Sequence, residues 1–375
     1  MPKPSHAEDS MMRCDVLIMA GGTGGHIFPG VALAQELLDR GHSVAWLGCK
    51  DSMEAQLVPQ HGIAFHTIEI SGVRGKGLLT KLKAPFSLLR SCLQAMAQVK
   101  VLAPKIVVGF GGFVAAPGGL AARLLRLPLF IHEQNAVAGT TNKLLARFSQ
   151  RVFTAFPHVF PRGEWIGNPI RRSLKELADP SQRKIACDDT RKILVLGGSR
   201  GARFLNLHVP ALMQTLGAKL NGLSLAVTHQ CGKGHKAKTQ QAYREAHFDS
   251  ANVVEFIDDI DVALAKADLV ICRAGASTVT ELCAVGVGSL LVPFPHAIDD
   301  HQTANAKFAV AKGAAMLQQE SGWANDELAK SLSSVLESKE RLLDMAQKAR
   351  SARKVDAAPF MASACESVIS FRGDR

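Results

Sequence analysis

Short apolar runs alternate along the chain with longer stretches in which apolar residues recur every three or four positions. Several runs have the length and continuity of strands buried in a parallel sheet. They cover residues 16–20, 44–47, 106–108, 127–131, 193–196, 268–272 and 290–295. The stretches between them have the period of amphipathic helices. This alternation predicts an α/β fold with doubly wound parallel sheets covered by helices.

The order of strand, glycine-rich loop and helix occurs twice, at Gly21–His26 and at Gly197–Ala202. A chain of 375 residues is also longer than one hydrophobic core usually serves. We therefore predict two Rossmann-like domains facing a cleft, with a hinge near Pro169. The predicted boundaries are 1–12 for a disordered tail, 13–169 for the first domain and 170–356 for the second.

Composition limits the class of protein. The eight cysteines lie far apart without a C-x-x-C pair, which is typical of a protein from a reducing cytoplasm. The polar residues 1–12 lack the apolar core of a secretory signal. The uncharged stretch 106–122 is interrupted by glycines and is shorter than the roughly 20 residues of a membrane span. We expect no segment that crosses a bilayer.

Positive charge is concentrated in the first half of the chain. The net charge is +11, and residues 1–169 hold 17 Lys/Arg against 10 Asp/Glu. Between Ile70 and His132 there are nine basic residues and no acidic one. This distribution favours a polyanionic partner for the first domain.

The loop Gly21–His26 contains four glycines. A backbone that approaches a phosphate or a sugar closely has no room for side chains, and the amides at a helix start favour anions. A tight turn is the alternative, although one glycine would be enough for it. His26 is a candidate general base, with roles as an oxyanion partner or as a helix cap left open.

Two further glycine loops follow predicted strands. Gly197–Ala202 suits a diphosphate because Ser199 can donate a hydrogen bond and the following helix offers its positive end. Arg200 either adds charge to this loop or points into water. Gly109–Phe113 either faces a ligand or lets neighbouring aromatic rings pack closely.

A hydrogen-bonding cluster, His132–Asn135, follows the run at 127–131. Asn135 suits a sugar hydroxyl and Glu133 suits a base. Either residue could instead cap the helix expected to begin near Thr140, and the pattern leaves both possibilities open.

Glu281 lies in the helical pattern that follows Arg273–Thr278. Its spacing from Thr278 matches a capping box, in which the two residues satisfy backbone donors at a helix start. A carboxylate at this position could also accept both hydroxyls of a ribose. The spacing does not decide between the two.

Acidic pairs raise the question of a metal ion. Asp258–Asp259 is one pair, and Asp299–Asp300 lies between His296 and His301. Adjacent aspartates point apart in most backbones, so we expect no bound metal. Gln302 is better suited to contact a sugar.

Residues 73–89 combine leucines with basic residues, a mixture that binds anionic bilayers through apolar insertion and charge attraction. The membrane-contacting residues that we predict are Arg74, Lys76, Leu78, Leu79, Lys81 and Leu82. A second set has the spacing of an ordinary buried helix face, and we expect it in the core. It consists of Phe86, Leu89, Leu93 and Met96.

Together the motifs resemble those of a known family. The ordered set is GGTGGHIFP at 21–29, GFGGF at 109–113, HEQN at 132–135, GNPIR at 167–171, GGSRGA at 197–202 and RAGASTVTEL at 273–282. This order and spacing resemble the MurG family of undecaprenyl-diphospho-muramoylpentapeptide N-acetylglucosaminyltransferases, in glycosyltransferase family 28. The resemblance extends over roughly residues 13–365.

The resemblance implies a glycosyltransferase-B fold and an inverting transfer of N-acetylglucosamine from UDP-N-acetylglucosamine (UDP-GlcNAc) to the muramoyl 4-hydroxyl of lipid I, which gives lipid II for peptidoglycan synthesis. It implies no tightly bound cofactor, because a helix dipole and loop amides replace a metal ion at the diphosphate. It also implies peripheral attachment to the anionic inner membrane at its cytoplasmic face, with other cell-wall or division proteins as further partners. Nucleic acid is not an expected partner.

The resemblance implies a set of donor-site residues as well. They are Thr23, Gly24, Gly25, Asn135, Arg171, Ser199, Ile257, Ala276, Ser277, Thr278, Val279, Thr280, Glu281 and Gln302. Within this set Ile257 meets uracil through its backbone, Glu281 meets the ribose and Gln302 meets the sugar. His26 and Glu133 stand where the family offers candidates for the base, and the resemblance leaves that choice open. A C-terminal helix at about 357–375 is implied to pack back on the first domain.

Other classes of protein remain open. Another enzyme of the same fold, such as a UDP-GlcNAc epimerase, would keep the donor motifs of the second domain. A nicotinamide oxidoreductase would need an acidic residue at the end of the second strand, where Leu47–Lys50 stands instead. A basic adaptor protein would bind DNA or membranes in a salt-dependent way that UDP does not affect.

Overall fold

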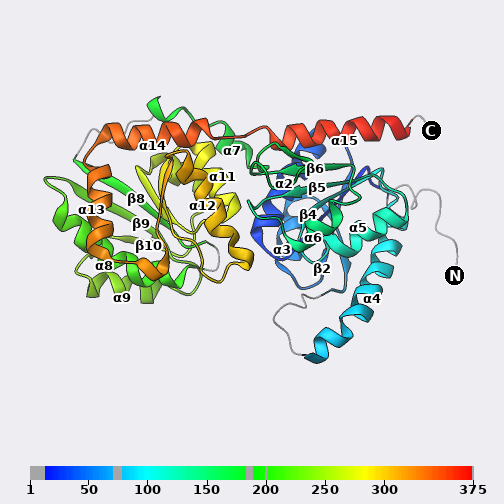
Figure 1. The fold of residues 1–375 in the computed structure, drawn as a ribbon, viewed down its shortest axis with the longest axis horizontal. Helices are drawn as coiled ribbons and strands as arrows, with labels where there is room; N and C mark the ends of the chain where they lie inside the picture. The colour runs from blue at the N-terminus through cyan, green and yellow to red at the C-terminus, as the bar shows by residue number, and fades with distance from the viewer. Residues whose placement is uncertain (1–12, 71–77, 183–188, 199–200, 374–375) are drawn as a thin grey trace. The chain divides into compact units, whose positions relative to one another are not determined.

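The computed structural model describes residues 13–70, 78–182, 189–198 and 201–373. The chain divides into two compact units (Figure 1). Unit 1 comprises Met1–Ile170 with Val355–Arg375, and unit 2 comprises Arg171–Lys354. Each unit contains one parallel sheet with helices packed against it, so the prediction of two doubly wound parallel sheets is confirmed. The predicted tail at 1–12 lies outside the described residues.

Unit 1 contains a seven-stranded sheet in the order β3-β2-β1-β4-β5-β6-β7. The strands are β1 (Val16–Ala20), β2 (Val44–Cys49), β3 (Ala64–Ile68), β4 (Ile106–Gly111), β5 (Leu129–Glu133), β6 (Arg151–Thr154) and β7 (Gly163–Trp165). The helices are α2 (Gly24–Asp39), α3 (Met53–Leu57), η1 (Val58–His61), α4 (Leu78–Leu102), α5 (Ala115–Leu124), α6 (Thr140–Leu145) and α15 (Ala357–Gly373). The central strands β1 and β4 are buried along their whole length, which explains their continuous apolar sequences.

Apolar cores lie on both faces of the unit-1 sheet. Successive residues of β1 contribute to opposite faces, because side chains alternate along a strand. Ile18 packs in the cluster that contains α2 residues and Met361 of α15, whereas Leu17 packs in the cluster that contains Ala95 of α4. α15 lies beside α2 although it follows unit 2 in the sequence (Figure 1). Arg40 and Glu366 fix this contact with an ion pair of 2.9 Å.

Unit 2 contains a six-stranded sheet in the order β10-β9-β8-β11-β12-β13. The strands are β8 (Thr190–Leu196), β9 (Ser224–Gln230), β10 (Asn252–Val254), β11 (Leu269–Cys272), β12 (Gly288–Leu291) and β13 (Ala315–Leu317). The helices are α7 (Arg172–Lys175), η2 (Pro180–Gln182), α8 (Arg203–Lys219), α9 (Lys236–Glu245), α10 (Ile260–Lys266), α11 (Ala276–Val285), η3 (Ile298–Asp300), α12 (His301–Ala311), η4 (Glu320–Gly322), α13 (Asn325–Leu336) and α14 (Lys339–Ser351). The sheet is parallel, so the loops that begin at the carboxyl ends of its strands lie at one edge.

The prediction that one face of α4 is buried is wrong for three of its residues. Phe86, Leu89 and Leu93 are 78%, 59% and 58% exposed, while Met96 is half-buried against the core. The buried face is the neighbouring one, formed by Ser91, Ala95, Val99 and Leu102. Both faces carry apolar residues at helical spacing, so periodicity alone did not distinguish them.

In the part of the chain that the structure describes, no helix combines the length and the apolar character needed to cross a membrane.

Candidate active site

The first glycine loop joins β1 to α2 and packs against the loop that follows β4. Gly112 has φ of +81°, and a Cβ atom there would come within 2.1 Å of the Gly21 carbonyl oxygen. Only glycine permits this backbone contact. The loop at Gly109–Phe113 therefore serves as a packing partner of the first glycine loop.

His26 lies in the first turn of α2, beside both loops. The N-cap of α2 is Thr23, which excludes the helix-cap alternative for His26. Thr23 Oγ1 lies 3.2 Å from His26 Nδ1. The half-buried imidazole also lies against Gly111, where a Cβ atom would be 3.1 Å from His26 Cδ2. The ring thus has a defined orientation at the start of a helix that begins with Gly24 and Gly25.

A buried carboxylate that no sequence motif marks holds the first glycine loop. Glu54 of α3 is 1% exposed. Its Oε2 accepts a hydrogen bond from the Gly22 N–H and its Oε1 accepts one from the Cys49 N–H, both at 3.3 Å. A Cβ atom on Gly21 would be only 2.6 Å from Glu54 Oε1, so the loop rests directly on the carboxylate. Glu54 therefore ties the end of β1 to the end of β2.

Glu133, at the end of β5, is buried and accepts four hydrogen bonds. Its Oε1 accepts from Asn135 N–H at 3.0 Å and from Asn135 Nδ2 at 3.3 Å. Its Oε2 accepts from Gly139 N–H at 3.0 Å and from Asn142 Nδ2 at 2.9 Å. Gly139 is the N-cap of α6, so this carboxylate satisfies a backbone donor at a helix start. Such a carboxylate is well suited to hold Asn135 in place.

His132 supports the same cluster from inside the sheet. It is fully buried, and its Nε2 lies 2.9 Å from the Gly167 carbonyl oxygen. Burial lowers the pKa of His132 to about 4, against the opposing effect of that backbone hydrogen bond. His132 is therefore neutral at physiological pH and fixes the position of Gly167.

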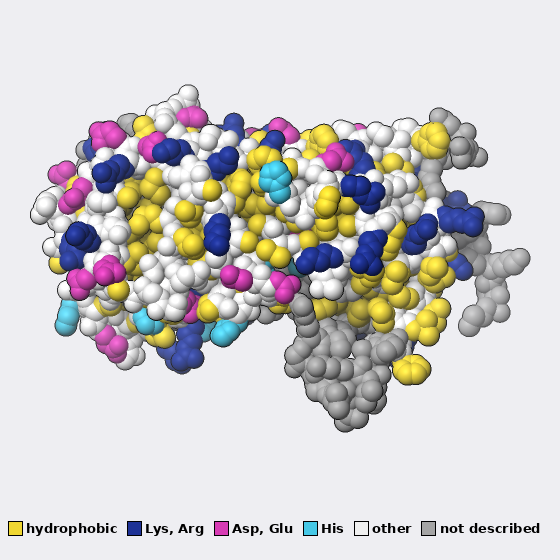
Figure 2. All heavy atoms as spheres, in the orientation of Figure 1, with side chains coloured by type: hydrophobic (Ala, Val, Ile, Leu, Met, Phe, Trp, Pro, Cys, Tyr) yellow, Lys and Arg dark blue, Asp and Glu magenta, His cyan; other side chains and the backbone are white. Residues whose placement is uncertain are grey.

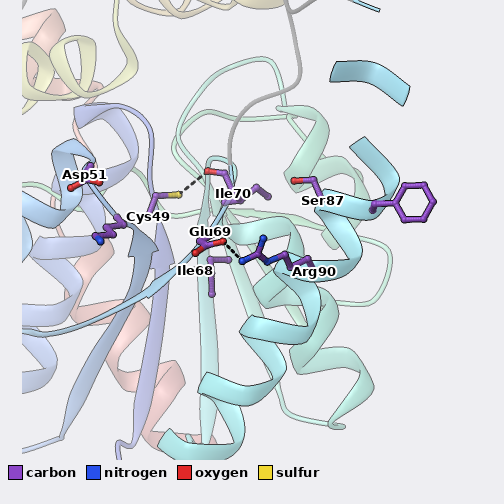
Figure 3. A pocket seen from close by; sticks show the side chains of 9 residues that line it. Cys49, Asp51, Ile68, Glu69, Ile70, Ser87 and Arg90 are labelled. Carbon is purple, nitrogen blue, oxygen red and sulfur yellow. Dashed lines mark hydrogen bonds and ion pairs between the residues drawn. The ribbon is translucent and has the colours of Figure 1, made fainter. Parts of the chain in front are cut away.

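An open hollow of about 710 Å³ lies at the carboxyl ends of β2 and β3, beside α4 (Figure 3). Arg90 and Glu69 form an ion pair of 2.7 Å across it, and the Cys49 thiol lies 3.6 Å from the Ile70 carbonyl oxygen. Burial, together with the nearby charge of Glu54, raises the pKa of Cys49 to about 11. Cys49 is therefore a protonated thiol and not a nucleophile at physiological pH.

The second glycine loop, in unit 2, joins β8 to α8. Ser199 and Arg200 lie outside the described residues. Gly201 has φ of +74°, and a Cβ atom there would be 2.3 Å from the Cys231 carbonyl oxygen. Gly201 therefore lies in close contact with neighbouring backbone, as Gly112 does in unit 1. Ala202 is the N-cap of α8 and offers no capping side chain, so none of the described residues is seen to cap this helix start, whose backbone amides favour an anion.

Glu281 lies in the second turn of α11, which begins at Ala276 with Gly275 as its N-cap. The capping-box alternative is therefore wrong, because Thr278 is inside the helix. Desolvation raises the pKa of Glu281 to about 7, although the charge of Arg171 opposes the shift. A half-buried carboxylate that titrates near neutral pH is typical of a functional site.

The remaining residues implied for α11 differ in what they expose. Ala276 and Val279 are buried, so only their backbones could meet a ligand. Thr280 donates its hydroxyl to the Ala276 carbonyl oxygen at 3.0 Å, whereas Ser277 and Thr278 are half-buried in the first turn.

Gln302 lies in the first turn of α12, after two aspartates with left-handed backbones. Asp299 and Asp300 have φ of 53° and 48°. Such strain in residues that are not glycine is common at ligand-binding sites. The Gln302 carbonyl oxygen Oε1 accepts a hydrogen bond from the Phe294 N–H at 2.9 Å, which directs the rest of this amide. Ile257 is half-buried in the loop after β10.

Within the described ranges, no three His, Cys, Asp or Glu side chains lie close enough together to hold a metal ion.

Parallel Rossmann-like sheets with glycine-rich loops at their carboxyl ends define the class of protein: a glycosyltransferase of the glycosyltransferase-B fold. The N-terminal domain of glycosyltransferase family 28 matches residues 16–154, and the C-terminal domain of this family matches residues 192–359. The chain therefore belongs to glycosyltransferase family 28.

Relatives match nearly the whole chain. A UDP-N-acetylglucosamine--N-acetylmuramyl-(pentapeptide) pyrophosphoryl-undecaprenol N-acetylglucosamine transferase of Acidovorax sp. (strain JS42) is 49% identical over 352 residues, which are 93% of this chain and 86% of that protein. The protein of the same name from Shewanella frigidimarina is 46% identical over 357 residues, 94% of this chain and 96% of its own.

Solved structures agree with this assignment. The crystal structure of Acinetobacter baumannii MurG matches with a TM-score of 0.81 and 41% identity, covering 94% of this chain and 99% of that one. The calicheamicin glycosyltransferase CalG4 matches with a TM-score of 0.65 but only 15% identity, so it shows the fold alone.

Proposed function

We propose that this protein transfers N-acetylglucosamine from UDP-GlcNAc to the 4-hydroxyl of the muramoyl group of lipid I, with inversion, to give lipid II. The observation that carries the proposal is identity at nearly half of the aligned positions, over more than nine tenths of the chain, to transferases named for this reaction. In this proposal the 13–169 domain receives lipid I and the 170–356 domain receives the donor.

The reaction requires a base near the acceptor and stabilisation of the leaving group. The muramoyl 4-oxygen attacks the anomeric carbon, the bond from that carbon to the β-phosphate oxygen breaks, UDP leaves, and the hydroxyl proton passes to the base. We assign the base to His26, because it is half-buried with an oriented ring, whereas the Glu133 carboxylate already accepts four hydrogen bonds. The start of α8 stabilises the leaving diphosphate without a metal ion.

The proposed donor contacts are those that the family resemblance implies. Glu281 accepts hydrogen bonds from the ribose hydroxyls, Gln302 contacts the sugar, and Ile257 meets uracil through its backbone. Arg171, whose charge acts on Glu281, belongs to the diphosphate region. Thr23, Gly24, Gly25 and Asn135 are proposed to border the same reactants from the first domain, and Ser199 is proposed to donate to the diphosphate.

Membrane attachment is proposed to use residues 73–82, where Arg74 and Lys76 and the side chains of Leu78, Leu79, Lys81 and Leu82 lie outside the described part of the structure. We propose that the exposed face of α4 from Phe86 onward adds to this contact. Phe86, Leu88, Leu89 and Leu93 are exposed on this helix, and Leu124 is exposed on α5, which packs beside it. Figure 2 shows hydrophobic side chains gathered in this region with Lys and Arg side chains along one side of them. Apolar insertion combined with positive charge is the mixture that anionic bilayers bind.

Transfer of radiolabelled sugar from UDP-GlcNAc to a short-chain lipid I analogue tests the proposed reaction, with EDTA present to test the metal-free donor site. A labelled disaccharide product is expected in EDTA. Absence of transfer under every metal condition would reject the proposal, and formation of an epimer of the donor would instead favour the epimerase alternative.

Sedimentation with vesicles that contain anionic lipid tests the attachment. Replacing Phe86 and Leu89 by serine should reduce vesicle binding and leave transfer to the short-chain acceptor intact. Leu207→Ser is the matched control, because Leu207 is 49% exposed on α8 of unit 2. Equal loss in the control would contradict a specific role of α4.

A further inference from the structure

Gln230, the last residue of β9, bridges two loops at the carboxyl edge of the unit-2 sheet. Its side chain is 5% exposed. Oε1 accepts a hydrogen bond from the Gly198 N–H at 2.9 Å. Nε2 donates to the carbonyl oxygens of Gly198 at 2.9 Å and of Glu255 at 3.0 Å. One amide therefore connects the glycine loop after β8 to the loop after β10.

The bridge fixes the start of the glycine loop. Gly198 has φ of +79°, and the side chain of Gln230 pairs with both its N–H and its carbonyl group. The backbone of Gln230 adds a hydrogen bond from the Gly197 N–H at 2.9 Å. Glutamate at this position could not donate the two bonds, and an apolar side chain would make none of the three. Glutamine therefore pairs with all three backbone groups: the Gly198 N–H, the Gly198 carbonyl group and the Glu255 carbonyl group.

The other end of the bridge fixes the loop that carries Ile257. The Glu255 carbonyl group accepts from Gln230, and Glu255 Oε1 accepts from the Gly234 N–H at 2.8 Å. The Cys231 N–H donates to the Val254 carbonyl oxygen at 2.9 Å. The side chain of Gln230 thus forms hydrogen bonds both with Gly198 and with the backbone of Glu255, two residues before Ile257.

We infer that Gln230 is a positioning residue that couples the diphosphate part of the donor site to its uracil part. The inference rests on the proposed function, because it takes a uridine diphosphate sugar as the donor. Because one amide holds both Gly198 and Glu255, uracil that binds at the loop after β10 also favours the position of the Gly198 backbone that the diphosphate meets. Without the bridge, uracil binding would have no effect on the position of Gly198.

Calorimetric titration of UDP and of uridine into the full chain tests the coupling. Gln230→Met keeps the size of the side chain and removes its hydrogen bonds, and Gln230→Glu keeps one acceptor and removes both donors. In both variants the affinity for UDP should fall about tenfold or more while the affinity for uridine falls less, so that the preference for UDP over uridine decreases. The midpoint of thermal unfolding confirms that each variant is folded at the titration temperature.

Tyr243→Phe is the matched control. The Tyr243 hydroxyl lies 3.0 Å from Nδ1 of the buried His229, the neighbour of Gln230 on β9. This variant also loses a buried hydrogen bond at the same strand and should lower the unfolding temperature, yet its preference for UDP over uridine should equal that of the wild type. An unchanged preference in both Gln230 variants, or an equal decrease in Tyr243→Phe, would overturn the inference.

Hydrogen exchange of the wild-type chain gives a second test that needs no variant. Uridine alone should slow exchange of the Gly198 amide, although a nucleoside has no diphosphate to contact it. Protection confined to the loop after β10 would overturn the inference. If the wild type binds neither uridine nor UDP, the proposed function fails, which is a different result from UDP binding that is independent of Gln230.

Discussion

The two units contain the same motif of strand, glycine loop and helix, yet they hold the loop with different chemistry. In unit 1 the carboxylate of Glu54 accepts hydrogen bonds from the loop and from the end of β2. In unit 2 the amide of Gln230 both accepts and donates. A carboxylate occupies a loop N–H and adds negative charge beneath it, whereas an amide leaves the loop neutral. The second arrangement is better suited to a loop that binds a diphosphate.

The largest effect should come from the first loop, through His26. His26→Ala should lower kcat by about 10²–10⁴-fold, the usual contribution of a general base, with little change in the KM for donor. His61→Ala is the control, because His61 is an exposed histidine of the same unit that lies 3.2 Å from Gln35. A smaller loss than in Glu133→Gln would make Glu133 the better candidate for the base.

The corresponding test in unit 2 concerns the charge of Glu281. Ribose hydroxyls need an ionised carboxylate as acceptor, so the KM for donor should rise as the pH falls through about 7, where burial places the pKa of Glu281. Glu281→Gln should have a KM about tenfold or more above the wild-type value at pH 8, with little dependence on pH. A KM that varies with pH equally in both proteins would contradict the role.

Stability should change in the opposite direction at this residue. The folded pKa of Glu281 is raised above the ordinary value of 4.5, so ionisation costs more in the folded chain than in the unfolded one. Glu281→Gln should therefore be more stable than the wild type at pH 8, with a difference that shrinks as the pH falls from about 7 toward 4.5. Urea unfolding at several pH values measures this, and an advantage that grows toward low pH would contradict it.

Exchanging the two anchoring chemistries tests the comparison directly. In Glu54→Gln the amide oxygen can accept from only one of Gly22 and Cys49, and its NH₂ group faces the other N–H. Loss of one such buried pairing costs about 1–3 kcal/mol. The KM for lipid I analogue should rise severalfold while UDP binding is unchanged, which is the reverse of the pattern expected for Gln230→Glu. Equal effects on both ligands would show that the anchors are not specific to their loops.

The sequence was sufficient to predict the glycine loops and the central strands of both sheets, because their signals are local, whereas the outer strands such as β3, β7, β10 and β13 were not predicted. Buried parallel strands appear as continuous apolar runs, and close backbone contacts require glycine at Gly112 and Gly201. Glu54 and Gln230 carry no such signal. Their partners are backbone atoms that only the folded sheet brings near, so nothing in the neighbouring sequence distinguishes them from ordinary surface residues.

Two ambiguities had a geometric origin. On α4 two neighbouring faces are apolar, and only packing shows that Ala95 and not Leu89 turns toward the core. On α11 the spacing of Thr278 and Glu281 fits a capping box, and only the start of the helix at Ala276 excludes it. On α4 a correct period was assigned to the wrong face, whereas on α11 the spacing left two possibilities open.

The smallest and most closely matched pair of variants replaces one glycine in each loop by alanine. Gly22 and Gly198 have φ of +95° and +79°, and an added Cβ atom would meet Phe113 at 3.8 Å in the first case and nothing within 4 Å in the second. Each substitution should therefore cost only the left-handed strain of about 1–2 kcal/mol in unfolding free energy. Gly217→Ala, within α8 and equally open, should instead stabilise the protein by about 0.5–1 kcal/mol. If the loops have separate ligands, Gly198→Ala should raise the KM for donor by a few-fold, and Gly22→Ala should raise the KM for acceptor. The same change of KM in both variants would mean that the two loops act on one ligand together.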